Sequence, residues 1–339
     1  MVVGGSNFDI ICQVNEALET NASTVNAKVR TCFGGVGRNL ADALARLDCN
    51  PIFISAVGDD HLGQCILSQN SKLDKSHVLI RKDTSTATYC LTLDASGDLK
   101  HGIGDMDIHQ TLTSADILKL KDVIVEGASM VVLDANFADQ TVDCILQLCH
   151  SCQIPVFFEP TDPRKACKAV KSAYASAIQF ASPNIHELRT MAQEVVSGLK
   201  TPPQQIVKPT ENEDNLEALL KECTSLGRIL MQKMPFATLV ITLGKHGALL
   251  IEPPTTTTKE AEEAGNTCHF KCVAEQDQNS IVSASGAGDC LAAAFISGLL
   301  QGLGRQEALR LGLKAARLSL NAIEAVPETL STLKNQNHE

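Results

Sequence analysis

The most informative segment lies near the C-terminal end, where residues Ser283 to Asp289 read Ser-Ala-Ser-Gly-Ala-Gly-Asp and lead into an apolar stretch. Gly286 and Gly288 allow a tight turn and a close approach of the backbone to a ligand. The free amides of a helix that begins here would attract an anion. Because Asp289 stands beside them, the segment suits an anion hole with a general base for phosphoryl transfer to a hydroxyl. A capped helix after a glycine-rich turn is the simpler alternative.

A second glycine-rich element, Phe33-Gly-Gly-Val-Gly-Arg-Asn39, opens the first long predicted helix. Gly35 and Gly37 again permit close approach of the backbone, and Asn39 offers both a donor and an acceptor to a polyol. A dinucleotide-binding fingerprint is disfavoured because Leu40 stands where its third glycine should be. This turn also follows a predicted peripheral sheet rather than the first core strand.

Composition limits the classes of protein to which the chain can belong. Its 339 residues are 44% hydrophobic, which suffices for one large α/β domain or two modest ones. The net charge is −10 and no Lys/Arg run is dense, so we expect no nucleic-acid partner. A small phosphorylated ligand can still be held by backbone amides. No apolar stretch is long enough to span a bilayer, so no membrane partner is expected either.

Thirteen cysteines are scattered along the chain, and no signal peptide precedes them. An odd number of this kind is typical of free thiols in a reducing compartment. We therefore expect a cytoplasmic protein, with an organelle as the alternative. Cys149 and Cys152 form one Cys-x-x-Cys, but no second pair or suitably spaced histidine accompanies them, which disfavours zinc and redox chemistry.

Apolar strands alternate with amphipathic helices along most of the chain. This alternation predicts a doubly wound α/β fold, with a mostly parallel sheet buried on both faces and ligands at the carboxyl ends of its strands. We expect strands at residues 51–57, 130–134, 155–159, 177–181 and 237–243, and helices at residues 36–47, 140–150 and 287–300.

Four segments depart from this alternation. Residues from about 10–31 and 84–110 contain short alternating strands, which predict either a small separate sheet, acting as a lid or an oligomer contact, or an ordinary peripheral hairpin. Residues 195–235 and 253–280 are polar and predict solvated loops. We expect a single domain over residues 1–334 and a disordered tail at 335–339.

Taken together, the motifs resemble those of one enzyme family. Gly34-Gly35-x-Gly37-x-Asn39 and Gly286-Ala-Gly-Asp289 are similar to the two signatures of the ribokinase, or phosphofructokinase-B-type, carbohydrate and nucleoside kinases. Asn184-Ile-His-Glu187 resembles the family's Asn-x-x-Glu motif, and Thr242-Leu-Gly-Lys-His-Gly247 resembles its turn under the nucleotide. The resemblance spans nearly the whole chain and implies a ribokinase-like fold with a small β-sheet lid, ATP and Mg²⁺ as cofactors, and a homodimer formed through the lid.

The resemblance also implies a role for each motif. Asp289 is the expected catalytic base, and the amides of Ala287, Gly288 and Asp289, freed by Gly286, are expected to hold the transferring phosphoryl group. Asn184 is expected on the nucleotide and Glu187 on Mg²⁺, although the same pair also fits a helix capping box. The remaining residues of the nucleotide-side turn are Thr242, Gly244 and Gly247, which also fit a plain hairpin turn.

The polyol is expected to lie against residues from the start of the chain and from the lid. Asn7 and Asp9 would share one strand face there, although an Asx turn is the alternative for Asp9. Gly35, Gly37 and Asn39 are expected beside them.

One position departs from the family pattern. Many members carry an acid where this chain has Ser283, and that acid helps to hold a monovalent cation. Ser285 also replaces a commoner Thr or Asn. Potassium activation is therefore doubtful, whereas the catalytic part of the motif, Gly286 to Asp289, is intact.

Three further segments resemble the pseudouridine kinase branch of the family: Gly104-Asp-Met-Asp-Ile108, Asp134-Ala-Asn136 and Phe158-Glu-Pro-Thr161. Asn136 could hydrogen-bond a base or a hydroxyl, and Thr88 and Tyr89 could close over it from the lid. Glu159 is expected either in the site or in a structural role. Met106 and Asp107 are weaker candidates.

This branch implies ATP-dependent phosphorylation of the 5′-hydroxyl of pseudouridine. The alternatives are another ribose-type acceptor, such as ribose or adenosine, and a nucleoside-binding module without turnover. Some proteins of this kind are fused to a pseudouridine-5′-phosphate glycosidase, and the abrupt start of the chain fits a kinase domain cut from such a fusion.

Overall fold

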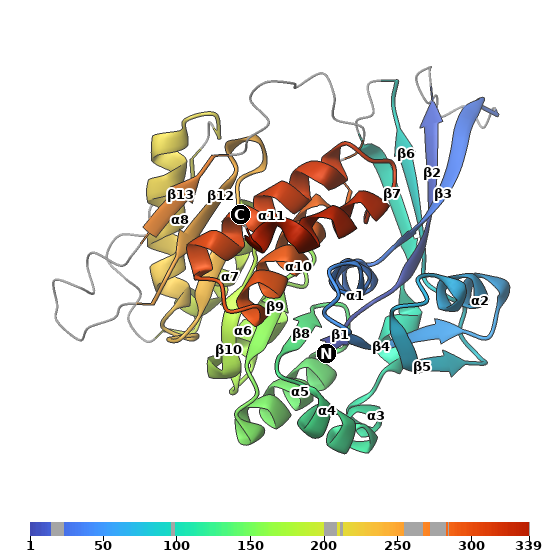
Figure 1. Cartoon of the computed structure of the whole chain (residues 1–339), viewed down its shortest axis with the longest axis horizontal. Coiled ribbons are helices and arrows are strands. Elements are labelled where there is room, and N and C mark those ends of the chain that lie inside the picture. Colours follow the sequence, from blue (N-terminus) through green and yellow to red (C-terminus); the bar gives the residue numbers. More distant parts are fainter. Residues whose placement is uncertain are drawn as a thin grey trace, which may run out of the picture.

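The larger of two sheets forms the centre of the molecule, and the smaller one projects from its side (Figure 1). The computed structural model describes residues 1–14, 24–95, 99–199, 209–210, 213–253, 267–271, 283 and 285–338. In the central sheet the seven strands from β5 to β11 in spatial order run parallel, and β12 and β13 extend it as antiparallel neighbours. The spatial order is β13 (Thr267–Phe270), β12 (Ala248–Ile251), β11 (Thr238–Thr242), β10 (Ile178–Ala181), β9 (Val156–Glu159), β8 (Val131–Asp134), β1 (Val2–Val3), β4 (Ile52–Gly58) and β5 (Asp74–Arg81).

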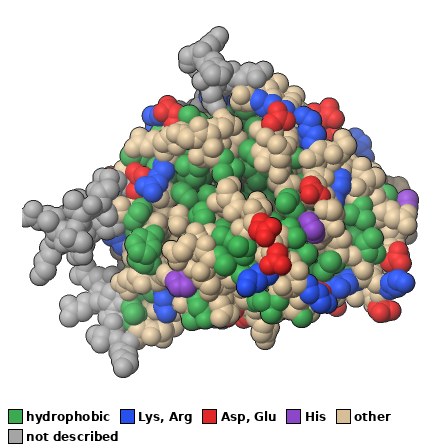
Figure 2. Space-filling model, turned by 60° about the horizontal axis from the view of Figure 1, so that its bottom comes forward, with side chains coloured by type: hydrophobic (Ala, Val, Ile, Leu, Met, Phe, Trp, Pro, Cys, Tyr) green, Lys and Arg blue, Asp and Glu red, His purple; other side chains and the backbone are tan. Residues whose placement is uncertain are grey.

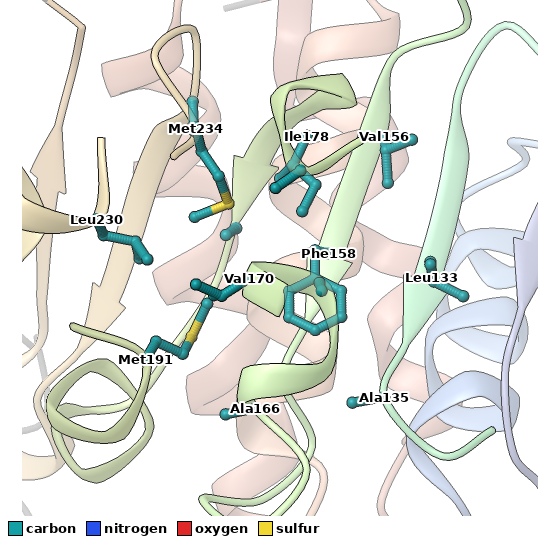
Figure 3. Packing of buried hydrophobic residues seen from close by; sticks show 14 of the residues in the cluster. Leu133, Ala135, Val156, Phe158, Ala166, Val170, Ile178, Met191, Leu230 and Met234 are labelled. Atoms are coloured by element: carbon teal, nitrogen blue, oxygen red, sulfur yellow. The ribbon is translucent and has the colours of Figure 1, made fainter. Parts of the chain in front are cut away.

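The core strands are apolar on both faces because helices cover both. Along β9, Val156 and Phe158 pack into the core on one face, while Phe157 packs into the core on the other. Figure 3 shows part of the first core, where Phe158 and Leu133 lie among side chains from the neighbouring helices. The first face is covered by α3 (Ser114–Lys119), α4 (Lys121–Gly127), α5 (Asp139–Cys152), α6 (Cys167–Lys171), α7 (Ile185–Ser197) and α8 (Leu216–Leu230).

The second face is covered by three helices and the C-terminal 3-10 segment. A glycine of α11 lets it pack closely against α10, because a Cβ at Gly312 would meet the Leu291 carbonyl oxygen at 2.8 Å. Residues Cys290 to Gly298 of α10 are all buried as a result. This layer consists of α1 (Val36–Arg46), α10 (Ala287–Leu300), α11 (Arg305–Leu320) and η6 (Glu328–His338).

The second sheet is built from strands that are distant in sequence. Its order is β3 (Ala27–Gly34), β2 (Asn7–Val14), β6 (Thr88–Leu93) and β7 (Leu99–Asp105), with β2 and β6 parallel and the outer pairs antiparallel. The predicted separate sheet is therefore confirmed, although β2 and β3 extend beyond residues 10–31 at both ends. The element that follows β7 is not a strand but the 3-10 helix η1 (Asp107–Thr111).

The core strands and the three helices expected from the sequence are all present within two residues of the predicted bounds. The expectation of a loop throughout residues 195–235 was wrong, because α8 occupies Leu216–Leu230. Leu219, Cys223 and Leu226 bury one face of α8, so the helix is amphipathic despite its polar flanks. Within the segment 253–280, residues 254–266 and 272–280 lie outside the described residues, and β13 stands between them. The backbone of residues 335–338, expected to be disordered, continues η6.

Charged side chains of both signs are interspersed on the face of the molecule drawn in Figure 2. Within the described part of the chain, no helix is both long enough and apolar enough to cross a membrane. The remaining short elements are α2 (His61–Ser68), η2 (Ala175–Ala177) and η3 (Gly244–His246).

Candidate active site

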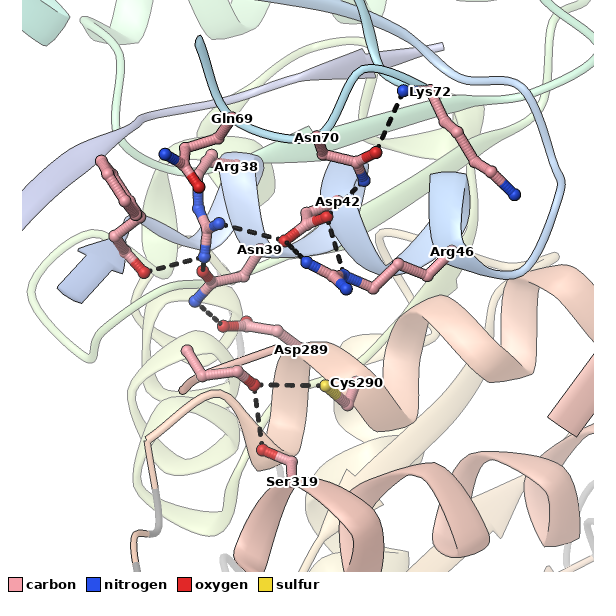
Figure 4. Close-up of polar contacts among 12 residues, drawn as sticks. Arg38, Asn39, Asp42, Arg46, Gln69, Asn70, Lys72, Asp289, Cys290 and Ser319 are labelled. Carbon is pink, nitrogen blue, oxygen red and sulfur yellow. Dashed lines mark hydrogen bonds and ion pairs between the residues drawn. The ribbon is translucent and has the colours of Figure 1, made fainter. Parts of the chain in front are cut away.

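The two glycine-rich elements meet in space, although 250 residues separate the two side chains that join them. Asn39 Nδ2, in the first turn of α1, donates a hydrogen bond of 2.7 Å to Asp289 Oδ2, in the first turn of α10 (Figure 4). Both helices begin at the carboxyl-end side of the central sheet, where ligands bind in doubly wound folds. The contact brings the predicted polyol-binding residue to the predicted base.

The N-terminus of α10 has the geometry of an anion site. Its first residue follows Gly286, which has φ of 79° and whose added Cβ would stand 2.3 Å from the Ala325 carbonyl oxygen. Only glycine is tolerated there without strain. No side chain among the described residues caps α10, and nothing lies within 4 Å of a Cβ placed at Gly288. The amides of Ala287, Gly288 and Asp289 therefore have no capping side chain in the described part of the chain, as an anion hole requires.

Two side chains hold this turn against the end of α11. The Ser319 hydroxyl donates to the carbonyl oxygens of Ser285, at 3.3 Å, and Ala325, at 3.0 Å. The buried Cys290 thiol donates to the same Ala325 carbonyl at 3.3 Å (Figure 4). Because these donors come from two helices, the turn is fixed before any ligand arrives.

Asp289 lies in an environment that raises its basicity. Burial raises the pKa of Asp289 to about 6, and the hydrogen bond from Asn39 and the charge of Arg38 oppose that rise. The nearby Asp134 carboxyl adds to it. A carboxylate with this pKa is ionised at neutral pH and is still a better proton acceptor than an ordinary aspartate.

Asp9 faces the site from β2 and is prepared for a polar ligand. Its side chain is only 8% exposed, and Oδ1 has no hydrogen-bond partner among the described residues. A Cβ at Gly34 would come within 2.0 Å of Asp9 Oδ2, so the glycine makes room for the carboxylate. Burial raises the pKa of Asp9 to about 6 as well, and Arg38 opposes the rise. A hydroxyl donor would satisfy the unpaired oxygen.

Asn7 lies beside a residue that the sequence analysis missed. Asn7 Oδ1 is 3.1 Å from Nε2 of His109, a residue of η1 that is 1% exposed. Burial lowers the pKa of His109 to about 4, and the charges of Lys165 and Lys168 contribute. The imidazole is therefore neutral at physiological pH. Its neighbours Met106 and Asp107 were noticed in the sequence, but a lone histidine gave no signal of its own.

The predicted ligand-binding glycines have packing roles in this structure. Gly35 has φ of 90°, and a Cβ there would be 2.6 Å from Ser6 Cα. A Cβ at Gly37 would be 2.3 Å from Gly4 Cα. The Gly37 amide donates to Asp134 Oδ2 at 2.9 Å. Both glycines thus bring α1 against the segment after β1, and this contact places Asn39.

Asp134 is a fully buried junction of three chain segments. Its Oδ2 accepts from the amides of Gly5 and Gly37 and from Asn136 Nδ2, at 2.8 to 2.9 Å. Asn136 Oδ1 accepts from Lys165 Nζ at 2.7 Å. The predicted substrate residue Asn136 is therefore held on both sides of its amide, which keeps one amide hydrogen and one lone pair of Oδ1 for a ligand.

Thr88 and Tyr89 lie on opposite faces of the second sheet. The register pairs Thr88 with Phe8 and Tyr89 with Asp9, and paired residues share a face. Tyr89 is therefore on the face of Asp9, where its hydroxyl oxygen would be 2.3 Å from a Cβ at Gly102. The predicted substrate residue Thr88 points to the other face, so the register favours Tyr89 over Thr88 as the residue nearer the site.

The Asn184–Glu187 pair forms the capping box that was the alternative reading. Asn184 Oδ1 accepts from the amides of His186 and Glu187, and Glu187 Oε2 accepts from the Asn184 amide at 2.8 Å. Asn184 also forms an isolated parallel bridge with Thr242. The cap therefore stands next to the end of β11.

The turn after β11 is the hairpin that was the other alternative. Gly244 and Gly247 have φ of 55° and 87°, and the chain reverses into β12. None of the residues that the structure describes lies within 4 Å of a Cβ at Gly244, so they leave this side of the turn open. A hairpin with an open side is compatible with the predicted nucleotide role of Thr242, Gly244 and Gly247.

Glu159 is bound structurally, through Ser182 and the Thr161 amide. It also belongs to a group of three acids with Glu187 and Asp289. Burial raises the pKa of Glu159 well above its usual range and that of Glu187 to about 7, and Asp289 adds to both. A divalent cation nearby would relieve this repulsion. In the described part of the chain, however, no three acidic, histidine or cysteine side chains stand close enough to form a complete cage.

The fold and the site define a class of protein: a mostly parallel α/β fold in which two glycine-rich turns meet beside the N-terminus of a helix and a carboxylate. The chain belongs to the pfkB family of carbohydrate kinases, and its match to this family covers residues 1–330.

Curated relatives and a solved structure agree with this class. The chain is 23% identical to a pseudouridine kinase from Arabidopsis thaliana, over 91% of this chain and 86% of that protein. It is 25% identical to a pseudouridine-metabolizing bifunctional protein of Schizosaccharomyces pombe, over 98% of this chain but only 47% of that protein. A ribokinase from Cryptococcus neoformans in complex with ADP superposes with a TM-score of 0.74 at 19% identity, covering 99% of this chain and 98% of that one. The predicted ribokinase-like fold is confirmed.

Proposed function

We propose that this kinase transfers the γ-phosphoryl group of ATP to the 5′-hydroxyl of pseudouridine and forms pseudouridine 5′-phosphate. The observation that carries the proposal is the 2.7 Å hydrogen bond between Asn39 and Asp289. It joins a polyol-binding motif to a base beside an anion hole, so a hydroxyl held by the first would lie against the second. The pseudouridine kinase relative supports the choice of acceptor.

The reaction then needs three actions from this chain. Asp289 takes the proton of the 5′-hydroxyl as the oxygen forms its bond to the γ-phosphorus, and the bond from that phosphorus to the bridging oxygen of ADP breaks. The amides of Ala287, Gly288 and Asp289 stabilise the charge that spreads over the transferring phosphoryl oxygens. Asp9 and Asn39 hold the ribose hydroxyls, and Asp9 Oδ1 gains the partner that it lacks.

The residues present fit Mg²⁺ held largely through water and phosphate oxygens. Burial is the main cause of the raised pKa of Glu159, Glu187 and Asp289, and the charge of Asp289 adds to the pKa of the two glutamates, so a cation beside them would be stabilised. Among the described residues no group of three acidic, histidine or cysteine side chains could hold the ion alone. Glu187 would hold the ion through water. When bound, Mg²⁺ neutralises charge on the β- and γ-phosphates.

The base of the nucleoside is proposed to lie near the carboxyl ends of β1 and β8. Asn136 presents one remaining amide hydrogen there, and the neutral His109 and the Lys165 ammonium stand beside it. This polar wall suits a pyrimidine with several carbonyl and N–H groups. Few aromatic residues are available for a purine clamp, since Phe, Trp and Tyr make up 4% of the chain.

An acceptor panel with ATP and Mg²⁺ tests the proposal. We expect kcat/KM to be higher for pseudouridine than for uridine, ribose and adenosine. Equal efficiency for ribose or adenosine would favour the alternative of another ribose-type acceptor. Binding of pseudouridine without turnover of any acceptor would favour a nucleoside-binding module. The C-glycosidic product cannot be phosphorolysed like an ordinary nucleoside, so we propose a pseudouridine-5′-phosphate glycosidase as the enzyme that consumes it.

A further inference from the structure

Arg38 is a buried cation that no predicted role accounts for. It follows Gly37 in α1 and is only 7% exposed. Its guanidinium makes three kinds of contact: Nη1 donates to Asp42 Oδ2 at 3.1 Å, and Nη2 donates to the Phe33 carbonyl at 2.8 Å and to Asn39 Oδ1 (Figure 4). A buried arginine is costly unless its donors are used, so these contacts are needed to keep it there.

The contact with Asn39 decides which way that amide points. A guanidinium has only donors, so it donates to the amide oxygen Oδ1 and cannot pair with the amide nitrogen. With Oδ1 turned to Arg38, Nδ2 must turn away, and it meets Asp289 Oδ2 at 2.7 Å. The reversed amide would set donor against donor at Arg38 and oxygen against carboxylate at Asp289. Arg38 therefore orients Asn39, and Asn39 orients the base.

Arg38 is itself held from behind. Asp42, which is 3% exposed, accepts from Arg38, from Arg46 Nε at 3.0 Å and from Asn70 Nδ2. Asn70 follows α2, so the contacts run from the α2–β5 connection through α1 to the N-terminus of α10 (Figure 4). Asn70 and Arg46 bind Asp42, and Asp42 binds Arg38, so this network fixes the guanidinium in one place.

We propose that Arg38 is a positioning residue of the phosphoryl transfer, which fixes the Asn39 amide toward Asp289 and supplies the positive charge that keeps the base ionised. The inference rests on the proposed function of Asp289. The charged groups around Asp289 are Arg38 on α1, Asp134 at the end of β8, Glu159 at the end of β9 and Glu187 on α7. Arg38 is the cation of this set, and it also opposes the raised pKa of Asp9.

The test compares Arg38→Met, Arg38→Lys and the control Arg46→Met, which loses a contact to the same Asp42 but touches neither Asn39 nor Asp289. The readouts are kcat and kcat/KM for pseudouridine from pH 5 to 9, the Kd of the nucleoside and the melting temperature. In Arg38→Met the acidic limb of kcat/KM should move up by about one pH unit, and kcat at pH 7 should fall at least about tenfold. Arg38→Lys keeps the positive charge but loses the paired donors of the guanidinium. Its kcat should therefore fall, while the acidic limb of kcat/KM stays at the wild-type pH.

A purely structural brace would give a different result. If Arg38→Met lowers the melting temperature and scales kcat equally at every pH, with the limb unmoved, the proposal is wrong. If Arg38→Met does not fold, Arg38→Lys decides: reduced kcat with unchanged nucleoside Kd supports the proposal, and wild-type kcat overturns it. The variant Asp289→Asn distinguishes a failure of the Arg38 proposal from a failure of the proposed function. Full activity of Asp289→Asn would refute the base itself, whereas an inactive Asp289→Asn with an unmoved limb in Arg38→Met refutes only the role of Arg38.

Discussion

At the scale of the residue, Asp289 combines a functional advantage with a cost to stability. Its pKa is raised from 3.8 to about 6, which means that the folded protein holds a proton there more readily than the unfolded chain does. The fold therefore loses stability as pH rises from about 4 to about 6, and the loss is constant at higher pH. The same shift gives a base that is ionised at pH 7 and lost below pH 6.

We predict that Asp289→Asn is inactive and more stable. Its kcat should fall by about 10²–10⁴, because the general base is removed while the hydrogen bond to Asn39 can remain. Without solvent screening, the raised pKa of Asp289 would lower the free energy of unfolding by about 3 kcal/mol. Because the side chain is only half-buried, screening reduces this cost to about 1 kcal/mol, which the variant should regain. Thermal unfolding at pH 8 should show the higher melting temperature, and the difference should vanish near pH 4. Substantial turnover by the variant would refute the assignment.

We also predict that the wild-type acidic limb of kcat/KM lies near pH 6, since the free enzyme's base must be ionised. The rate should fall below this pH as Asp289, and Asp9 with it, takes up a proton. A pH–rate profile for pseudouridine measures it. A limb near pH 4, the ordinary range of a carboxyl, would contradict the environment described for these two residues.

Ser283 and Ser319 bear on ion dependence. Ser283 carries no charge, and the Ser319 hydroxyl already bridges the carbonyl oxygens of Ser285 and Ala325. We predict that turnover in K⁺ and in a bulky organic cation agrees within about twofold. Initial rates in potassium chloride and in the chloride of the organic cation, at equal ionic strength, test this prediction. A strong preference for K⁺ would mean that the serine bridge is not sufficient.

At the scale of the element, two glycines at the N-terminus of α10 differ in what a larger side chain would disturb. Gly286 has positive φ, and a Cβ there would clash with the Ala325 backbone, whereas a Cβ at Gly288 would meet none of the described residues within 4 Å. We predict that Gly286→Ala loses more than about 2 kcal/mol of stability, from the strained backbone and the clash. Gly288→Ala should change stability by less than about 0.5 kcal/mol.

Gly288→Ala, the variant that should keep its stability, is the one that we expect to lose activity. In Gly288→Ala the added methyl group stands where the phosphoryl group is proposed to lie, so kcat or the KM for ATP should be strongly impaired in a folded protein. Urea unfolding and steady-state kinetics on the same samples provide both measurements. Normal kinetics in Gly288→Ala would place the anion elsewhere.

Sequence periodicity predicted α1 correctly but not its surroundings. Leu40 and Leu44 bury one face as expected, yet Arg38 and Asp42 on the other face are buried as well. Charged residues at intervals of four along a helix usually mark a solvated face. Here the α2–β5 connection covers them, and no local pattern encodes a contact with a loop some thirty residues away. The motifs located the base and its helix, whereas the supporting contacts of Arg38 and Asp134 depend on tertiary packing.

The order of strands was likewise beyond local patterns. Alternation predicted the core strands because both faces are apolar, but it could not show that β2 pairs with β6 in parallel across some eighty residues. The same limit explains the placement of Thr88. Whether a strand residue faces the site depends on register, and a one-residue change reverses the face.

At the scale of the whole molecule, the outer face of the small sheet is unusually apolar for a surface. Val29 is 63% exposed and Ile103 is 72% exposed, and register places them on the face opposite Asp9, with the exposed Cys90 beside Ile103. Such a face favours burial against another protein surface. The proposed homodimer through the lid would bury it.

We predict that the protein is dimeric in solution and that the double variant Val29→Asp/Ile103→Asp is monomeric. The two-fold symmetry of such an interface would bury the introduced carboxylates of both protomers without a positively charged partner, which is strongly unfavourable. Light scattering after size exclusion gives the mass. Phe236→Asp, which changes an equally exposed apolar residue outside the small sheet, serves as the control and should remain dimeric. A monomeric wild type would refute lid-mediated dimerisation.

The position of β1 has a consequence for how the protein is made. Val2 and Val3 lie fully buried between β4 and β8, and Val3 is in register with Leu133. On the ribosome β1 therefore emerges about 130 residues before its second neighbour, a delay on the order of ten seconds at typical elongation rates. Throughout that interval the nascent chain exposes the apolar edge of an unfinished sheet. Chaperone capture of the first half should depend on how quickly β8 is translated, so slow codons before residue 131 would affect yield more than slow codons after it.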